Sequence, residues 1–230
     1  MRVQPRIRNL ALIGVVLVSV SCGSKYVIEG TVGAYGYEGQ LLTVVEYTPY
    51  SSTTFDSCLV SHGKFNMKGK TDQTRLVFLC RNGQPVLPLY LERGKTTVSI
   101  EPTDIQRGGT RQNELLNSFL ISKKPLDNKY DDVWQKRVEL MRSGRIDNER
   151  MSELQDSLRL IVTECEELIY NFISSNYREE AATGVFAMLT ATSGRQISTL
   201  MRRVLDDAPE KFINSPIVQD YIGRTGYTKP

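Results

Sequence analysis

The sequence predicts an α+β protein, in which an antiparallel β-sandwich of about seven strands is followed by an α-helical domain with a long αα-hairpin. Two observations carry this prediction. Short runs rich in β-branched and aromatic residues, separated by turn residues, fill the chain from residue 25 to residue 101. After Pro102 the spacing of apolar residues becomes three or four, which is the period of an amphipathic helix.

Seven short strands are predicted in the first part. Turn residues such as His62-Gly63 and Asn82-Gly83 separate one run from the next. Many short strands at this spacing are typical of a β-sandwich. The predicted strands cover residues 26–28, 41–47, 53–60, 64–67, 75–80, 86–91 and 96–100.

Helices are predicted after residue 103. Thr110 can cap a first helix, a second runs from about residue 127 to Ser143, and Asp147 can cap a third, long helix. Because only a few residues join the second and third, they should form an antiparallel hairpin. Further helices are expected over residues 181–189, over residues 196–205 and from Pro216 onwards.

The first 21 residues have the features of an export signal. Three arginines precede an apolar run over residues 10–20, which is shorter than the roughly 20 residues needed to span a bilayer. Its length suits a signal-peptide core, and it ends in small residues directly before Cys22. That ending resembles the lipobox of bacterial lipoprotein precursors, although Ser19 stands where leucine is commonest. The alternative is an ordinary secretory signal that leaves Cys22 as a plain thiol.

The lipobox resemblance implies that Cys22 carries lipid and anchors the chain. We therefore expect a signal peptide over residues 1–21, a sandwich domain over 22–103 and a helical domain over 104–230. No acidic run follows Cys22, which favours the outer membrane and its periplasmic side. The chain has 29 Lys and Arg against 26 Asp and Glu, and three of the arginines are in the leader, so the remainder is balanced. Nucleic acid is not expected as a partner.

No catalytic constellation is evident in the sequence. Thioredoxin-type chemistry needs a C-x-x-C pair, which the chain lacks. The one histidine, His62, falls in a predicted turn, and no Cys/His cluster has zinc spacing. We expect no enzymatic activity, no metal and no cofactor. An oxidising periplasm would permit a Cys58–Cys80 disulfide, with buried free thiols as the alternative.

Tyr35 and Tyr37, in a glycine-rich loop, are the one feature that suggests ligand contact. Exposed aromatic rings on a sandwich loop can stack on sugars or anchor a protein partner. The alternative is that both rings cover the end of the sandwich as core or rim residues.

Several short motifs resemble a known family. They are Tyr26-x-Ile28-x-Gly30, Asp56-Ser57-x-x-Val60, Gly63-Lys64-Phe65-x-Met67-x-Gly69, Leu91-Glu92-x-Gly94, Asn113-x-x-Leu116-x-x-Phe119 and Phe172-Ile173-x-x-Asn176. Together they resemble the N-terminal domain of unknown function, and the helical connector, of Gram-negative thioredoxin-like thiol:disulfide interchange lipoproteins. In that family a catalytic thioredoxin domain follows the connector, whereas this chain ends at Pro230. The resemblance thus implies an envelope module without redox activity of its own.

The expected function is that of a non-enzymatic, membrane-anchored envelope lipoprotein that binds a protein or another envelope partner. One alternative is an accessory to a separate thiol:disulfide oxidoreductase, acting through Cys58 or Cys80. Another is a glycan-binding module built on Tyr35 and Tyr37.

Overall fold

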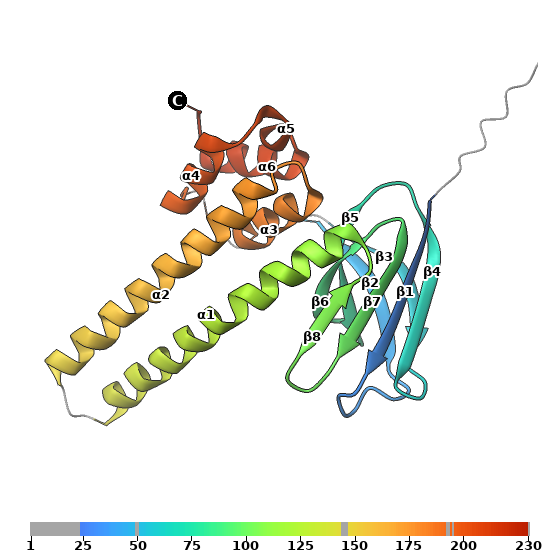
Figure 1. Ribbon diagram of the computed structural model, residues 1–230, viewed down its shortest axis with the longest axis horizontal. Coiled ribbons are helices and arrows are strands. Elements are labelled where there is room, and N and C mark those ends of the chain that lie inside the picture. Colours follow the sequence, from blue (N-terminus) through green and yellow to red (C-terminus); the bar gives the residue numbers. More distant parts are fainter. Residues whose placement is uncertain (1–23, 49–50, 144–146, 192–193, 195, 230) are drawn as a thin grey trace, which may run out of the picture.

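A β-sandwich and a helical region follow one another along the chain (Figure 1). The computed structural model describes residues 24–48, 51–143, 147–191, 194 and 196–229. Cys22 and the predicted signal peptide lie outside these residues. The α+β class expected from the sequence, with the β-domain first, is confirmed.

The sandwich consists of two four-stranded sheets, with strand orders β4-β1-β7-β8 and β3-β2-β5-β6. Paired strands are antiparallel except β1 and β7, which run parallel. The first seven strands match the predicted ones, whereas β8 has a single apolar residue and is not apparent in the sequence pattern. The strands are β1 (Ser24–Val32), β2 (Leu41–Tyr47), β3 (Ser52–Leu59), β4 (Lys64–Thr71), β5 (Arg75–Arg81), β6 (Gln84–Leu91), β7 (Gly94–Ile100) and β8 (Ile105–Gly108).

Two glycines on β1 and β4 lie beneath aromatic rings in the sandwich core. Gly30 is opposite Phe65, and Gly69 is opposite Tyr26. A Cβ at Gly30 would come within 2.2 Å of the Phe65 ring, and one at Gly69 within 2.7 Å of the Tyr26 hydroxyl oxygen. Each ring therefore occupies the space that a side chain on the opposite strand would need, which explains the glycines in two of the motifs.

The helical region begins with one 32-residue helix where the sequence predicts two. α1 continues through Pro125, so the prediction of a separate helix from residue 127 is wrong. Proline removes the N–H that would bond to the Ile121 carbonyl, but both residues are exposed, and water can satisfy that carbonyl. The helices are α1 (Arg111–Arg142), α2 (Asn148–Ser175), α3 (Glu180–Thr190), α4 (Thr199–Asp207), α5 (Glu210–Ile213) and α6 (Pro216–Thr225).

α1 and α2 form the expected antiparallel hairpin, and the two helices project away from the sandwich (Figure 1). Asp147 caps α2 as predicted, since its Oδ1 accepts a hydrogen bond from the Arg150 backbone N–H at 2.9 Å. At the other end of the hairpin α3–α6 enclose a second core, separate from the one between the sheets. In this core the Phe186 ring makes edge contacts with Phe212 and Tyr221, at centroid distances of 5.7 and 5.2 Å.

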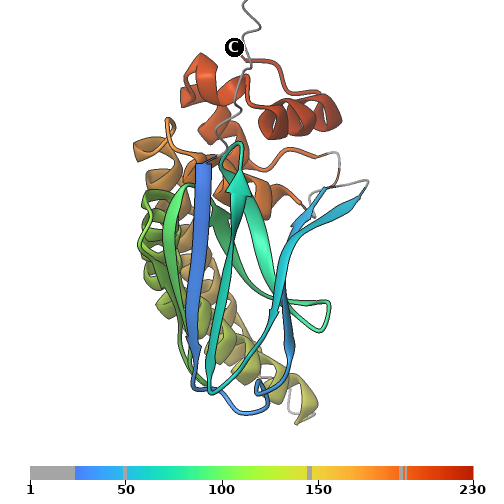
Figure 2. The same ribbon diagram turned by 90° about the vertical axis from the view of Figure 1, so that its right-hand side faces the viewer.

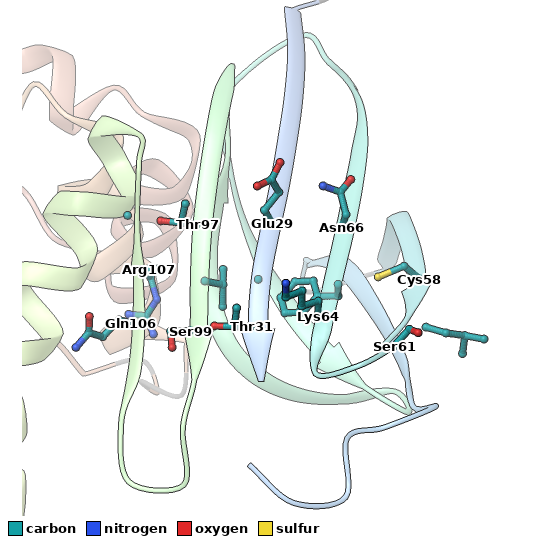
Figure 3. A pocket seen from close by; sticks show the side chains of 15 residues that line it. Glu29, Thr31, Cys58, Ser61, Lys64, Asn66, Thr97, Ser99, Gln106 and Arg107 are labelled. Carbon is teal, nitrogen blue, oxygen red and sulfur yellow. The ribbon is translucent and has the colours of Figure 1, made fainter. Parts of the chain in front are cut away.

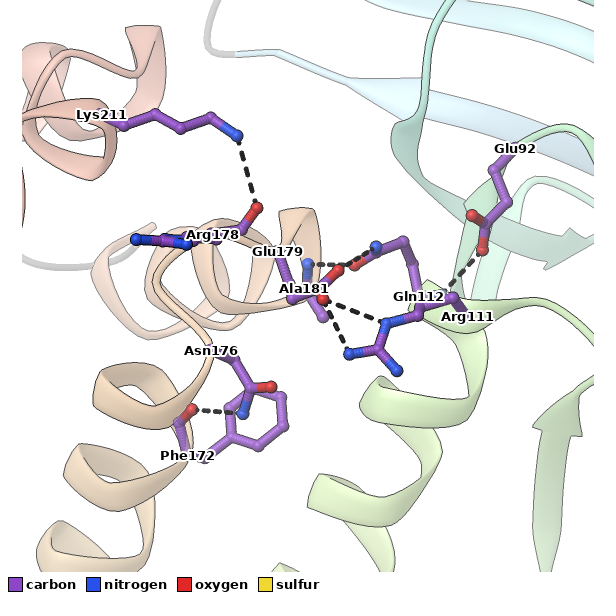
Figure 4. A network of polar contacts seen from close by, with 9 residues as sticks. All are labelled: Glu92, Arg111, Gln112, Phe172, Asn176, Arg178, Glu179, Ala181 and Lys211. Atoms are coloured by element: carbon purple, nitrogen blue, oxygen red, sulfur yellow. Dashed lines mark hydrogen bonds and ion pairs between the residues drawn. The ribbon is translucent and has the colours of Figure 1, made fainter.

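A polar network joins the start of α1 to the sandwich and to α3 (Figure 4). Gln112 makes three hydrogen bonds of this network. Its backbone N–H donates to Glu92 at 3.0 Å, its side-chain oxygen accepts from the Ala181 N–H at 2.8 Å, and its Nε2 donates to Glu179 at 2.7 Å. Arg111 also donates to Glu179, and these two donors hold the pKa of the Glu179 carboxyl below its usual value. The hairpin is thereby fixed in its direction relative to the sandwich.

Candidate binding surfaces

A half-exposed aromatic pair lies on the projecting part of the hairpin. Tyr130 and Trp134 are one turn apart on α1, and their rings stack with centroids 6.3 Å apart and planes 7° apart. The exposed fractions are 37% for Tyr130 and 40% for Trp134. The sequence places both on the apolar face of the helix, but α2 alone is too narrow to cover that face. The sequence does carry a signal that could have indicated this surface: aromatic residues one turn apart on a helix that is predicted to pack against only one other helix.

The aromatic pair forms one wall of a groove between α1 and α2. A cavity of about 450 Å³ is lined by Tyr130, Trp134, Arg137, Gln155, Leu158, Arg159, Val162 and Thr163. A second cavity of about 140 Å³ shares Tyr130 and Val162 with the first. We call the two cavities together the hairpin groove.

The hairpin groove combines aromatic and cationic groups. The Arg137 guanidinium lies 5.3 Å from the centroid of the Trp134 ring, and its buried Nε has no acceptor among the residues that the structure describes. Arg159, on the opposite wall, pairs with Asp156 at 3.3 Å. Trp, Tyr and Arg are the residues that contribute most often to the energy of protein–protein interfaces. The groove is therefore chemically suited to a protein surface that offers an acceptor for Arg137.

A cavity of about 880 Å³ forms an open trough on the outer face of sheet β4-β1-β7-β8 (Figure 3). Polar side chains, among them Thr31, Asn66, Thr97 and Ser99, share the lining with the apolar Leu59, Phe65 and Val98. The one carboxylate in the lining belongs to Glu29, which pairs with Lys95 at 2.6 Å. Cys58, Lys64 and Arg107 are the other ionisable side chains of the lining.

Tyr35 and Tyr37 do not form one stacking surface. Tyr35 is 97% exposed, whereas Tyr37 is 9% exposed and packs with the sandwich core. The Arg81 guanidinium covers the Tyr37 ring at 4.5 Å from its centroid. Of the two residues predicted to contact a ligand, only Tyr35 offers its ring to solvent.

Cys58 and Cys80 cannot form a disulfide in this fold. Cys58 is opposite Leu42 and Cys80 is opposite Thr43, so β2 lies between the two cysteines. Leu42 and Thr43 are consecutive and point to opposite faces of the sheet, and so do the cysteines paired with them. Two strand spacings amount to roughly 10 Å, beyond the limit of about 7 Å between the Cα atoms of a disulfide. Both thiols are free, as is that of Cys165.

Burial raises the pKa of the Cys58 and Cys165 thiols above their ordinary value. The thiolate is the form that reacts with iodoacetamide. We therefore expect the modification rate of both thiols at pH 7 to be lower than that of a free cysteine by a factor of about three or more. The rate should keep rising with pH above the ordinary cysteine pKa of about 8.5. Mass spectrometry of the alkylated protein measures both quantities. Modification at the rate of free cysteine, or a plateau below pH 8, would contradict the raised pKa.

His62 lies in the predicted hairpin turn. His62 and Gly63 have φ angles of 51° and 66°, and their backbone N–H groups donate to the Glu38 carboxylate at 3.0 and 3.2 Å. Within the part of the chain that the structure describes, no three His, Cys, Asp or Glu side chains are grouped so that they could hold a metal ion. Over the same residues, no helix has the length and apolar character needed to cross a bilayer.

Comparison with known proteins bears on the first half of the chain. No curated protein matches the sequence. A family model described as "Domain of unknown function (DUF4369)" matches residues 26–116, which cover the sandwich from β1 to β8 and the first turns of α1. Residues 26–116 thus form an N-terminal domain of unknown function.

Proposed function

We propose that this protein is a non-enzymatic lipoprotein of the cell envelope, anchored through lipid on Cys22, that binds a protein partner in the hairpin groove. The leader and the small residues before Cys22 support the anchor. Ser24, two positions after Cys22, is already the first residue of β1. The end of α1 and the start of α2 lie at the opposite end of the molecule from the start of β1 (Figures 1 and 2). An anchored molecule would therefore present the groove away from the membrane.

The stacked pair of Tyr130 and Trp134 is the observation that carries the partner-binding part of the proposal. Stacking fixes both rings before binding, so less conformational entropy is lost when a partner covers them. Val162, 43% exposed, extends the apolar surface across to α2. A projecting hairpin with such a surface on one side resembles half of a helix-packing interface.

The motifs shared with thioredoxin-like lipoproteins add a proposal about the class of partner. If the DUF4369 domain and the helical region are the non-catalytic modules of such proteins, the partner would be another envelope protein. The raised pKa of the Cys58 and Cys165 thiols favours binding over a redox role for this chain.

Photo-crosslinking in intact cells tests the groove. A photoreactive amino acid at Val162 is expected to capture a protein partner, and one at Gln219, exposed on α6, is not. With the probe at Val162, Trp134→Ala should reduce the crosslinked product at least tenfold, because central aromatic residues of interfaces typically contribute about 2 kcal/mol or more.

Tyr35→Ala is the matched control, since it removes a ring that is 97% exposed on the sandwich. The crosslinked product should not change in this variant. Capture that is insensitive to Trp134→Ala, or a loss only in the Tyr35→Ala variant, would place the partner elsewhere. Turnover of a substrate at enzyme-like rates by the purified protein would overturn the non-enzymatic assignment.

A further inference from the structure

Four lysines gather on the outer face of sheet β4-β1-β7-β8, at the end where β1 begins. Lys25 on β1 is opposite Lys70 on β4. Two residues further along β1, Val27 is opposite Lys68 and beside Lys95 of β7. Residues in register share one face of a sheet, so all four lysines point outward. We call Lys25, Lys68, Lys70 and Lys95 the lysine cluster.

The lysine cluster has little compensating charge. All four side chains are exposed. On the outer face of β1, β4 and β7 the only carboxylate is that of Glu29, which pairs with Lys95 at 2.6 Å. Among the described residues, no carboxylate forms an ion pair with Lys25, Lys68 or Lys70. Like charges directly opposite each other destabilise a sheet unless an anion lies against them. Lys25 and Lys70 are such a pair.

The chain enters the sandwich at this same end. β1 starts at Ser24, directly after the segment that contains the apolar run and Cys22. Only Gly23 separates Cys22 from Ser24 along the chain. Lipid on Cys22 would therefore hold the lysine cluster at the membrane surface. The trough begins at Glu29, which pairs with Lys95, and extends along the strands to Thr31 and Lys64, six residues or about 20 Å from Lys25 and Lys70.

We propose that the lysine cluster binds the anionic headgroups of phospholipids in the membrane that carries the anchor. This inference rests on the membrane anchoring proposed above. A charged membrane surface attracts ammonium groups over about 8 Å at physiological salt, and Lys25 and Lys70 are the lysines of the cluster nearest to Ser24 in the strand register. Contact at this end fixes the tilt of the sandwich, so that the far end of the trough and the hairpin groove stay clear of the membrane.

Lysine labelling of the lipidated protein in vesicles tests the contact. The protein is reconstituted in phosphatidylethanolamine–phosphatidylglycerol vesicles and in neutral phosphatidylcholine vesicles, and acetylation by an amine-reactive reagent is followed by mass spectrometry. At low salt, acetylation of Lys25, Lys68, Lys70 and Lys95 should be about fivefold slower in the anionic vesicles, and this protection should disappear near 1 M salt. Lys64, at the far end of β4, and Lys136, on the hairpin, should react equally in both.

A charge-reversed variant strengthens the test. Lys25→Glu, Lys68→Glu and Lys70→Glu combined should abolish the difference between the two vesicles for the remaining Lys95. The matched control reverses three exposed cations of the hairpin, Lys129, Lys136 and Arg159, and should leave the protection intact.

Each of the other outcomes overturns a different part of the proposal. Equal labelling in both vesicles, with the protein floating with both, overturns the headgroup contact and leaves the anchor standing. A protein that lacks the acyl mass and floats with neither overturns the anchor and this inference together. Protection in intact cells but not in anionic vesicles would assign the lysine cluster to an acidic protein instead.

Discussion

Replacing Asn113 with leucine is expected to lower the free energy of unfolding by about 3 kcal/mol or more. Asn113 is completely buried in the first turn of α1. Its Oδ1 accepts a hydrogen bond from the Tyr90 backbone N–H at 2.8 Å, and its Nδ2 donates to the Tyr90 carbonyl at 2.8 Å. The amide thus pairs with edge strand β6 in the way that a further strand would. Leucine has a similar volume but leaves both backbone groups buried without partners, at about 1–3 kcal/mol each.

The matched control is Asn117, one turn later on α1. Its Oδ1 accepts from the backbone N–H of Arg107 on β8, the edge strand of the other sheet, at 3.1 Å. This side chain is half-buried and makes a single such bond, so Asn117→Leu should cost about 1 kcal/mol. Urea unfolding of the two variants beside the unchanged protein measures both losses. A loss at Asn113 no greater than that at Asn117 would show that the paired amide is not what holds β6.

The two asparagines explain why the start of α1 belongs physically to the sandwich. Asn113 bonds to one sheet and Asn117 to the other, so the helix closes the side of the sandwich where β6 and β8 are both edges. The DUF4369 match also extends beyond β8, to Leu116. Asn113 belongs to one of the sequence motifs, but its hydrogen bonds to Tyr90 could not be predicted from the sequence, because Tyr90 lies 23 residues earlier in the chain.

Local chemistry made much of the fold predictable. Strand runs and turns follow from neighbouring residues, and Asn82-Gly83 adopts the positive φ angles, 49° and 80°, that such a pair favours in tight hairpins. The capping of α2 by Asp147 is equally local. These features need no knowledge of what packs against them, so the sequence was sufficient for them.

Features that depend on distant packing were not predictable. Pro125 favours a helix end locally. α1 nevertheless continues through it, because the face of the helix opposite Pro125 is packed on the rest of the protein. Tyr35 and Tyr37 are two residues apart, yet one is 97% exposed and the other 9%. The hairpin groove and the lysine cluster likewise arise only when segments far apart in the sequence come together.

Replacing Gly184 with alanine should also lower the free energy of unfolding by about 3 kcal/mol, although alanine normally favours a helix by about 1 kcal/mol over glycine. Gly184 is buried in α3 where the helix meets β6. A Cβ there would lie 1.8 Å from the Tyr90 hydroxyl oxygen and 3.0 Å from the ring carbon that carries it. The Tyr90 hydroxyl donates to the Glu180 carbonyl at 2.8 Å, so it cannot move without losing that bond.

A double-mutant cycle with Tyr90→Phe tests whether this contact is the cause. Tyr90→Phe alone should cost about 1 kcal/mol for the lost hydrogen bond. Combined with Gly184→Ala it should cost less than the sum of the two single losses, by about 1–2 kcal/mol, because the atom nearest the new methyl group is gone. Gly223→Ala is the control: Gly223 lies in α6 with no atom within 4 Å of its Cβ position, so that variant should gain about 0.5–1 kcal/mol. Additive losses in the cycle would mean that the methyl group displaces the α3 backbone rather than Tyr90, and the tight packing of α3 on β6 would then need another origin.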